Sequence, residues 1–580
     1  MTSSEIPIQK LRDPQLDIVP RVYYAKMGGS NITHNEYSAI SSTNSQVVFS
    51  TTTPSVNVGL SRRMYWQMNV VVTFPAGIVA ANLPTVADLL RSTSAGLRAY
   101  PCAYATDTLS LKLNNATITV NTADIIHATQ RYGTNPDERN KFMSGSPSFP
   151  DEVSSYNAEA GLNAGARYPF SQYTTNVEEI SRQAFHWLSD VTIELAPVTV
   201  PATTRERVRS CVITLLEPLF VPPLNWTEKD VQALFGIQTI DITVQLASNL
   251  KNRIFSGIFQ AAGYGQNSLS DAVVSVGANG LKPILHVLYI TPQSNEKIPE
   301  VLHYPYYEIG KYSTNGASLF ANKYAVSGIR LDGCKSSTSV NNISLHSVPK
   351  RVYIYGAVRK SAYDSAVGGQ IPNIFARITK MSVNWNNQAG MLSSASEYDL
   401  YRMSVKNGCD QSWTEWTTYT GGVLCLEPST DLGLGLVEAP GSRGNYQLQY
   451  KIDYENLIYD DIVIPDEPIA NKYPYDIFTV VINEGFMTIN DATVSLDIGV
   501  LTEASIRDAE YAPHGTFNEI SNLWGGGFFG DLWRGIKTAA RVGVKIAPDV
   551  ISGIGKIAEV AKGGSRGGAR MTKRSLSQRL

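Results

Sequence analysis

The segment 446–454 constrains the fold of this chain more than any other. Tyr446, Leu448, Tyr450, Ile452 and Tyr454 occupy the even positions, and the odd positions between them are all polar. Successive side chains of a β-strand point to opposite faces, so this strict alternation predicts a strand with one buried face. The segment therefore belongs to a sheet that covers a core on one side.

Similar short segments occur in two successive sets, one on each side of a proline-marked stretch from Pro292 to Pro305. They are rich in β-branched and aromatic residues and lie near Gly, Pro, Asn or Ser, as strands do. Strands do not alternate regularly with helices, which argues against a parallel α/β fold. Strands are expected at 46–52, 64–74, 110–120, 191–195, 207–215, 239–246 and 284–290, and then at 306–312, 351–357, 375–385, 423–426, 445–454, 477–483 and 493–501, with short helices at 86–91, 122–131 and 396–406.

Two sets of short strands joined by long, polar connections predict an all-β chain of two consecutive jelly-roll sandwiches, a double jelly roll, with a C-terminal amphipathic helical tail. Residues 1–45 are expected to form an N-terminal arm, 46–295 the first jelly roll, 296–510 the second, and 511–580 a linker and cationic amphipathic tail. The connection 133–183 is longer than compact domains usually contain, which indicates a functional loop.

No signature of catalysis, metal binding or cofactor binding appears in the sequence. Phosphate-loop, zinc-helix, nucleophile-elbow and EF-hand patterns are all absent. The seven histidines do not pair at helical spacing, and the five cysteines lack CxxC spacing, which favours buried free thiols. The acidic pairs Asp460-Asp461 and Glu178-Glu179 are typical of solvated edges. We therefore expect neither an enzyme nor a cofactor.

The net charge of −2 conceals two parts of opposite sign. From Gly527 onward the chain has eleven Lys plus Arg and three Asp plus Glu, a net +8, which leaves 38 basic and 48 acidic residues, a net −10, in the rest. The acidic body argues against DNA recognition by the main fold. The tail is a candidate to contact nucleic acid, anionic lipid or the body itself.

The tail has the pattern of a cationic amphipathic helix that follows a flexible joint at 521–527 and is separated from a second helix by Pro548. Such a helix suits three partners: a groove on its own assembly, a membrane interface, or nucleic acid contacted by the last residues. Its apolar residues are Phe529, Leu532, Trp533 and Ile536, and its cations include Arg534, Lys537 and Arg541.

Three segments give the chain a resemblance to a known family. They are 125–132 (IIHATQRY), 383–392 (VNWNNQAGML) and 413–416 (WTEW). With the order of strands over most of residues 1–510, these segments resemble the double jelly-roll major capsid proteins of virophages and Polinton-like viruses, which are related more distantly to adenovirus hexon.

The resemblance implies a structural protein of an icosahedral virion, assembled in the host cytoplasm or nucleus. It implies a homotrimer that forms a pseudo-hexameric capsomer and contacts neighbouring capsomers and a minor capsid or penton protein. Aromatic residues often anchor such interfaces. The candidates are Tyr304, Tyr306, Tyr307, Trp413 and Trp416.

The resemblance also suggests that the tail is processed. Residues 523–526 (LWGG), which precede Gly527, are similar to sites of adenovirus-type proteases, which implies a viral cysteine protease as a partner and cleavage between Gly526 and Gly527. A weaker match lies at 551–555. Residues 530–537 look like the lytic helix of an adenovirus membrane-disrupting protein, so the released tail is expected to act as cement or as a membrane-active peptide.

Two other classes remain open on the sequence alone. The many Tyr, Trp and Asn residues are compatible with a carbohydrate-binding or carbohydrate-cleaving β-sandwich protein, although the cationic tail counts against it. A minor vertex or fibre protein is the third class, and two complete sandwiches argue against it.

Overall fold

The computed structural model describes strands 8–11 and 23–26 and most of residues 31–499. The gaps within 31–499 are 78–82, 84–94, 98–99, 133–191, 198–203, 225–232, 258–271, 278–279, 293–297, 299, 321–333, 365–374, 410–411, 414–415, 418–421, 436–437, 457–471 and 491.

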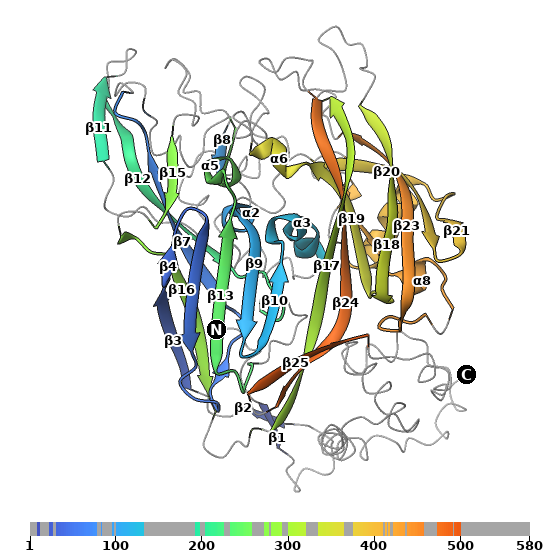
Figure 1. Ribbon diagram of the computed structural model, residues 1–580, viewed down its shortest axis with the longest axis horizontal. Coiled ribbons are helices and arrows are strands. Elements are labelled where there is room, and N and C mark those ends of the chain that lie inside the picture. Colours follow the sequence, from blue (N-terminus) through green and yellow to red (C-terminus); the bar gives the residue numbers. More distant parts are fainter. Residues whose placement is uncertain are drawn as a thin grey trace, which may run out of the picture.

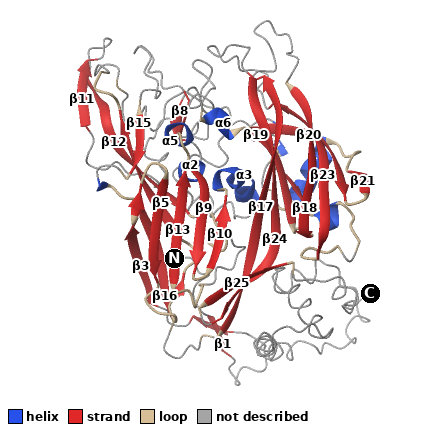
Figure 2. Ribbon diagram, viewed as in Figure 1, coloured by secondary structure: helices blue, strands red, loops and turns tan. Residues whose placement is uncertain are grey.

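The described chain is mostly β, with short helices between strands (Figures 1 and 2). The first sandwich has one sheet ordered β3-β16-β7-β12-β11, flanked by β6 and β15, and a second ordered β4-β5-β13-β9-β10. Their bounds are β3 Asn31–Ser38, β4 Ser41–Ser42, β5 Gln46–Thr52, β6 Gly59–Leu60, β7 Tyr65–Thr73, β9 Thr106–Leu113, β10 Ala116–Val120, β11 Thr192–Pro197, β12 Thr204–Pro218, β13 Thr239–Leu246, β15 Val273–Val276 and β16 Ile284–Thr291.

The second sandwich repeats this plan. Its sheets are ordered β17-β24-β19-β22, with β25 beside β24, and β18-β23-β20-β21. Matching the two halves in chain order aligns β3, β16, β7 and β12 with β17, β24, β19 and β22, and likewise aligns β5, β13, β9 and β10 with β18, β23, β20 and β21. The bounds are β17 Val301–Phe320, β18 Lys335–Ser347, β19 Arg351–Val358, β20 Ala376–Trp385, β21 Gln388–Met391, β22 Leu424–Leu426, β23 Arg443–Asn456, β24 Lys472–Asn490 and β25 Thr493–Ile498.

The described helices connect strands along the chain. Two small sheets accompany them, β1 Ile8–Leu11 with β2 Tyr23–Lys26, and β8 Ala95–Leu97 with β14 Phe255–Gly257. The helices are α2 Pro101–Ala105, α3 Thr122–Tyr132, α5 Leu250–Ile254, α6 Lys360–Tyr363, α7 Glu397–Lys406 and α8 Pro428–Asp431.

The alternation at 446–454 forms β23 as expected, with Leu448, Tyr450, Ile452 and Tyr454 buried. The expected single strand at 110–120 is instead the hairpin of β9 and β10. It turns at Asn114, whose φ of 52° asparagine tolerates better than most residues. The pair Asn114-Asn115, within a run of strand-forming residues, is the sequence signal that could have indicated this turn.

The expected arm 1–45 contains more regular structure than its polar composition indicated. Residues 31–38 form β3, which pairs with β16 along its whole length. Strand β3 lies at a sheet edge, and most of its side chains are exposed. Backbone hydrogen bonds to β16 therefore stabilise the strand, and its sequence needs no alternation of apolar and polar residues. Expected boundary residues 295 and 296 lie between β16, which ends at Thr291, and β17, which begins at Val301. Residues 511–580 lie outside the described residues.

Candidate functional site at the contact between the two sandwiches

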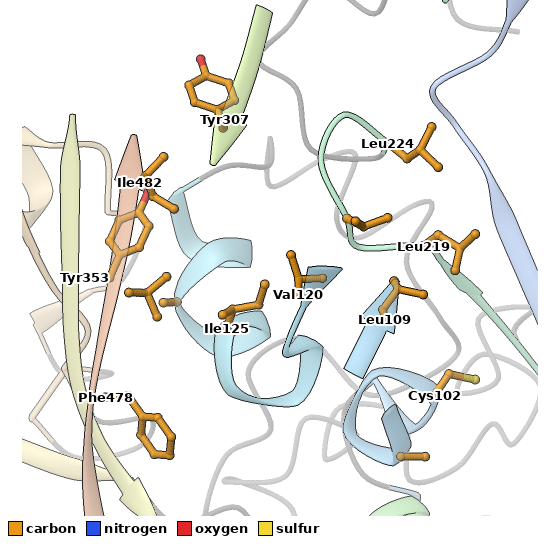
Figure 3. Packing of buried hydrophobic residues seen from close by; sticks show 14 of the residues in the cluster. Cys102, Leu109, Val120, Ile125, Leu219, Leu224, Tyr307, Tyr353, Phe478 and Ile482 are labelled. Carbon is orange, nitrogen blue, oxygen red and sulfur yellow. The ribbon is translucent and has the colours of Figure 1, made fainter. Parts of the chain in front are cut away.

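Helix α3 of the first sandwich lies against the sheet of β19 and β24 in the second (Figure 3). The stretch 122–132 forms a helix because its apolar residues recur at helical spacing and Asp124 in the first turn favours the helix dipole. His127 stacks on Phe375 with ring centroids 3.6 Å apart. Tyr132 stacks on Tyr353 at 4.7 Å. A non-polar contact therefore joins two segments more than 200 residues apart in the chain.

Asp124 is the ionic centre of this contact. Its side chain is only 4% exposed, and its carboxylate forms ion pairs with Lys311 Nζ at 2.6 Å and with Lys360 Nζ at 2.9 Å. The Tyr355 hydroxyl donates to the Asp124 backbone carbonyl. Burial, and then the negative charge of Asp124, raise the pKa of Tyr355 well above its usual value. Tyr355 therefore stays protonated and remains a hydrogen-bond donor.

A hydrogen-bonded contact joins the sandwiches at the β9–β10 turn. Asn114 Nδ2 donates to the carbonyl of Ala492 at 2.7 Å, while its Oδ1 accepts from the backbone of Gln238 and Thr239. Asn115 and Val494 exchange two further hydrogen bonds at 2.7 and 3.1 Å. Two consecutive asparagines thus fix the turn to β25 and its preceding loop.

Helices α5 and α6 make a third contact. Arg253 donates from Nε and Nη2 to the two carboxylate oxygens of Asp364, each at 2.9 Å. Asn252 Nδ2 donates to the Tyr363 carbonyl at 2.9 Å. The planar guanidinium and the planar carboxylate form two parallel hydrogen bonds, which fix the orientation of the two groups as well as the distance between them. The three contacts together hold the sandwiches in one relative position.

Three of the candidate interface aromatics are buried within the single chain. Tyr304 accepts a hydrogen bond from the Phe235 backbone N–H at 2.9 Å, and the guanidinium of Arg62 lies 5.2 Å from its ring centroid. Burial lowers the pKa of Arg62 to about 10. Tyr306 and Tyr307 are also buried, and the ammonium of Lys350 lies 5.4 Å from the Tyr307 ring. These tyrosines have little surface left to contribute to an interface.

The two candidate tryptophans differ in exposure. Trp416 is fully buried, whereas Trp413 is half-buried and contacts the rings of Tyr398 and Tyr401. An interface role for Trp413 stays a prediction. Tyr398 carries more exposed surface than either tryptophan, and the helical spacing of 396–406 could have indicated it. Gly526, Gly527 and the tail residues Phe529, Leu532, Trp533, Arg534, Ile536, Lys537 and Arg541 lie outside the described residues.

The described residues contain no group of three His, Cys, Asp or Glu side chains arranged to hold a metal ion. Nor does any described helix have the length and apolar character needed to cross a membrane. All five cysteines are buried and free, as their spacing predicted. The main feature of the described residues is therefore a pair of sandwiches that three contacts hold together.

Comparison with known proteins gives the family. The model for the Sputnik virophage major capsid protein first domain matches residues 6–282, and the model for the major capsid protein V20 C-terminal domain matches residues 318–469. The chain is 26% identical to the capsid protein V20 of Sputnik virophage over 570 residues, which covers 94% of this chain and 89% of that protein.

Two solved structures share the fold. The Sputnik virophage structure obtained by cryo-electron microscopy has a TM-score of 0.68 and 23% identity, and covers 90% of this chain and 98% of that chain. The crystal structure of the mavirus major capsid protein has a TM-score of 0.60 and 15% identity, and covers 87% and 98% respectively. The chain therefore belongs to the virophage major capsid proteins of the double jelly-roll type, the non-enzymatic shell proteins of an icosahedral, virophage-like virion.

Proposed function

We propose that three copies of this chain form a pseudo-hexameric capsomer, the repeating unit of the shell. The matching strand order of the two sandwiches carries the proposal. A homotrimer of such chains contains six similar sandwiches, which suits near-sixfold packing, while the unlike connections of the two halves allow distinct contacts between capsomers. The interlocked contact at Asp124 supports it, because a fixed angle between halves lets a ring close.

Native mass spectrometry and negative-stain electron microscopy of the purified full chain test this proposal. A mass of three chains and particles with a hexagonal outline are expected. A monomer, or an oligomer that is not a trimer or a multiple of trimers, would contradict it. The division into an arm at 1–45, jelly rolls at 46–295 and 296–510, and a tail at 511–580 belongs to the same proposal.

We infer that the tail has a separate role in maturation. The support is its sequence: a net charge of +8 opposite an acidic body, and a flexible joint at 521–527. A viral cysteine protease would cut between Gly526 and Gly527, and the released peptide would act as cement between capsomers or on a membrane. Contact with nucleic acid through the last basic residues is the remaining alternative.

Intact-mass measurement on purified mature particles tests the cleavage. The expected mass corresponds to residues 1–526, and Gly526→Asp is expected to leave the full-length chain in the particles. A full-length wild-type chain in infectious particles would end this part of the proposal without affecting the trimer. A minor capsid or penton protein remains a proposed partner, to be sought by cross-linking of the same particles.

A further inference from the structure

The two sandwiches carry a helix at the same position. Helix α3 follows the β9–β10 hairpin and packs on β9, and α7 follows the β20–β21 hairpin and packs on β20. Because β9 and β10 align with β20 and β21, α3 and α7 are equivalent elements of the two jelly rolls. A difference between the elements that pack on α3 and those that pack on α7 therefore reflects the position of each sandwich in the molecule.

Helix α3 is covered by the second sandwich of its own chain. It contacts the outer face of β19 and β24, where Tyr353 lies opposite Val480 and Tyr355 lies opposite Phe478. Figure 3 shows Tyr353 and Phe478 beside the helix. All four of these residues are buried, so the contact excludes water from this face of the sheet.

The equivalent face of the first sandwich is incompletely covered. Strands β7 and β16 align with β19 and β24, and their inward side chains, such as Trp66 and Leu285, belong to the core. On the outward face Tyr65 lies opposite His286 and Gln67 lies opposite Ile284, and all four are only half-buried. The His286 side chain is 30% exposed, and its Nδ1 lies 3.6 Å from Glu36 Oε1 on the edge strand β3.

Helix α7 presents the complementary surface. Tyr398 is 53% exposed and Val405 is 42% exposed, a large apolar area for one short helix. The Tyr398 ring packs edge-on against Trp413 at 5.2 Å, and Trp413 packs against Tyr401 at the same distance. The ring of buried Trp416 packs edge-on against the other aromatic ring of this cluster, Tyr401, with the ring centroids 5.7 Å apart. A rigid aromatic cluster with one exposed end is typical of an interface anchor.

We propose that α7 docks on the β7–β16 face of the first sandwich in a second copy of this chain. The contact uses the same pair of elements that already joins the two halves within one chain. Repeating one head-to-tail contact from copy to copy closes a ring when the rotation permits. The inference rests on the proposed trimer and adds to it the surfaces that form the interface.

The geometry assigns a role to each side. Tyr398 and Val405 would bury their exposed area against Tyr65 and Ile284. This arrangement parallels α3, whose aromatic residues lie against Tyr353 and whose Asp124 meets lysines of the second sandwich. The aromatic positions at this interface are thus Tyr398 and Trp413, whereas the tyrosines of β17 belong to the core of one chain.

The test compares two double variants of the full chain by native mass spectrometry. Tyr398→Glu with Val405→Glu places two charges in the proposed contact. Tyr312→Glu with Val56→Glu makes the same changes at positions 37% and 46% exposed elsewhere on the molecule. We expect the first variant to be monomeric, with trimer formation weakened at least about 100-fold, and the second to form trimers like the wild type.

Circular dichroism of both variants checks that the fold is kept. If the α7 variant forms trimers as the wild type does, the docking surface is wrong while the trimer stands. If the wild type forms no trimer, the proposed capsomer fails and the docking proposal with it.

A photo-crosslinking residue at position 398 gives a second readout that does not depend on stability. It is placed in a mixture of light and isotopically heavy copies. Cross-links between light and heavy chains are expected to map to residues 65–73 or 284–291. Cross-links that map to another surface would overturn the assignment.

Discussion

Asp124 shows how one side chain can fix the relation of two domains. Its carboxylate is almost fully buried, and the two lysines that bind it come from the second sandwich and remain about one-quarter exposed. A buried carboxylate is unfavourable without partners, and its partners are available only when the sandwiches are in contact. The residue therefore stabilises one arrangement of the halves more than it stabilises either half alone.

We expect Asp124→Asn to lower the free energy of unfolding by about 2 kcal/mol, because Lys311 loses its carboxylate partner and Lys360 keeps only the longer contact with Asp107 at 3.5 Å, while both can still reach water. Asp241→Asn is the matched control. Asp241 and Lys112 lie 3.8 Å apart with side chains 38% and 49% exposed, and such exposed pairs contribute about 0.5 kcal/mol. Denaturant unfolding of both variants makes the comparison. Equal losses would contradict the central role of Asp124.

At the scale of elements, the short helix α2 depends on a carboxyl group from strand β12. Glu217 is fully buried and accepts hydrogen bonds from the backbone N–H of Cys102 at 2.8 Å and of Ala103 at 3.0 Å. These N–H groups are unpaired within a helix that begins at Pro101, so Glu217 replaces a capping side chain. Burial nevertheless raises the pKa of Glu217 to about 8.

This raised pKa predicts a pH dependence of stability. In the unfolded chain Glu217 loses its proton near pH 4.5, whereas in the folded chain it keeps the proton up to about pH 8. The folded state thus binds more protons between these values. Stability contributed by Glu217 is fully present below pH 4.5 and is lost as the pH rises through about 8.

Glu217→Gln is expected to flatten this dependence, because glutamine does not titrate. Urea unfolding measured at several pH values between 4.5 and 8 tests the expectation. Glu300→Gln, at an exposed position, serves as the control and should keep the wild-type slope. A Glu217→Gln slope equal to that of the wild type would show that Glu217 is not the group responsible.

At the scale of the whole molecule, one hydrophobic cluster runs through both sandwiches. It includes Ile125 and Leu111 of the first half and Tyr353 and Ile482 of the second, and half-buried Tyr132 packs against it. Tyr132 also donates a hydrogen bond to the Val423 carbonyl at 2.5 Å. Two cores joined in this way cannot lose one half without exposing apolar surface on the other.

We therefore expect the two sandwiches to unfold in one cooperative transition. Differential scanning calorimetry of the full chain should give a single peak. His127→Ala removes the stacking on Phe375 and is expected to lower Tm and broaden the transition. Resolved transitions for the two halves of the wild-type chain would show that the contact does not couple them.

The sequence by itself determined much of the local structure. Alternation of period two placed β23, and helical spacing placed α3 and α7 within a residue or two of their observed ends. Side chains of a strand or helix repeat with the geometry of the backbone, so these patterns need no knowledge of distant residues. Scattered cysteine spacing likewise indicated the free thiols.

Only the tertiary structure decided what each buried face packs against. Tyr304, Tyr306 and Tyr307 are of the residue type that often anchors interfaces, but the fold buries them within one chain. Tyr398 remains exposed. Strand β3 has no clear apolar pattern, because an edge strand is held by backbone pairing with β16. The pairing of Asp124 with Lys311 depends on residues 187 positions apart. Such contacts arise from chain topology, which no local pattern encodes.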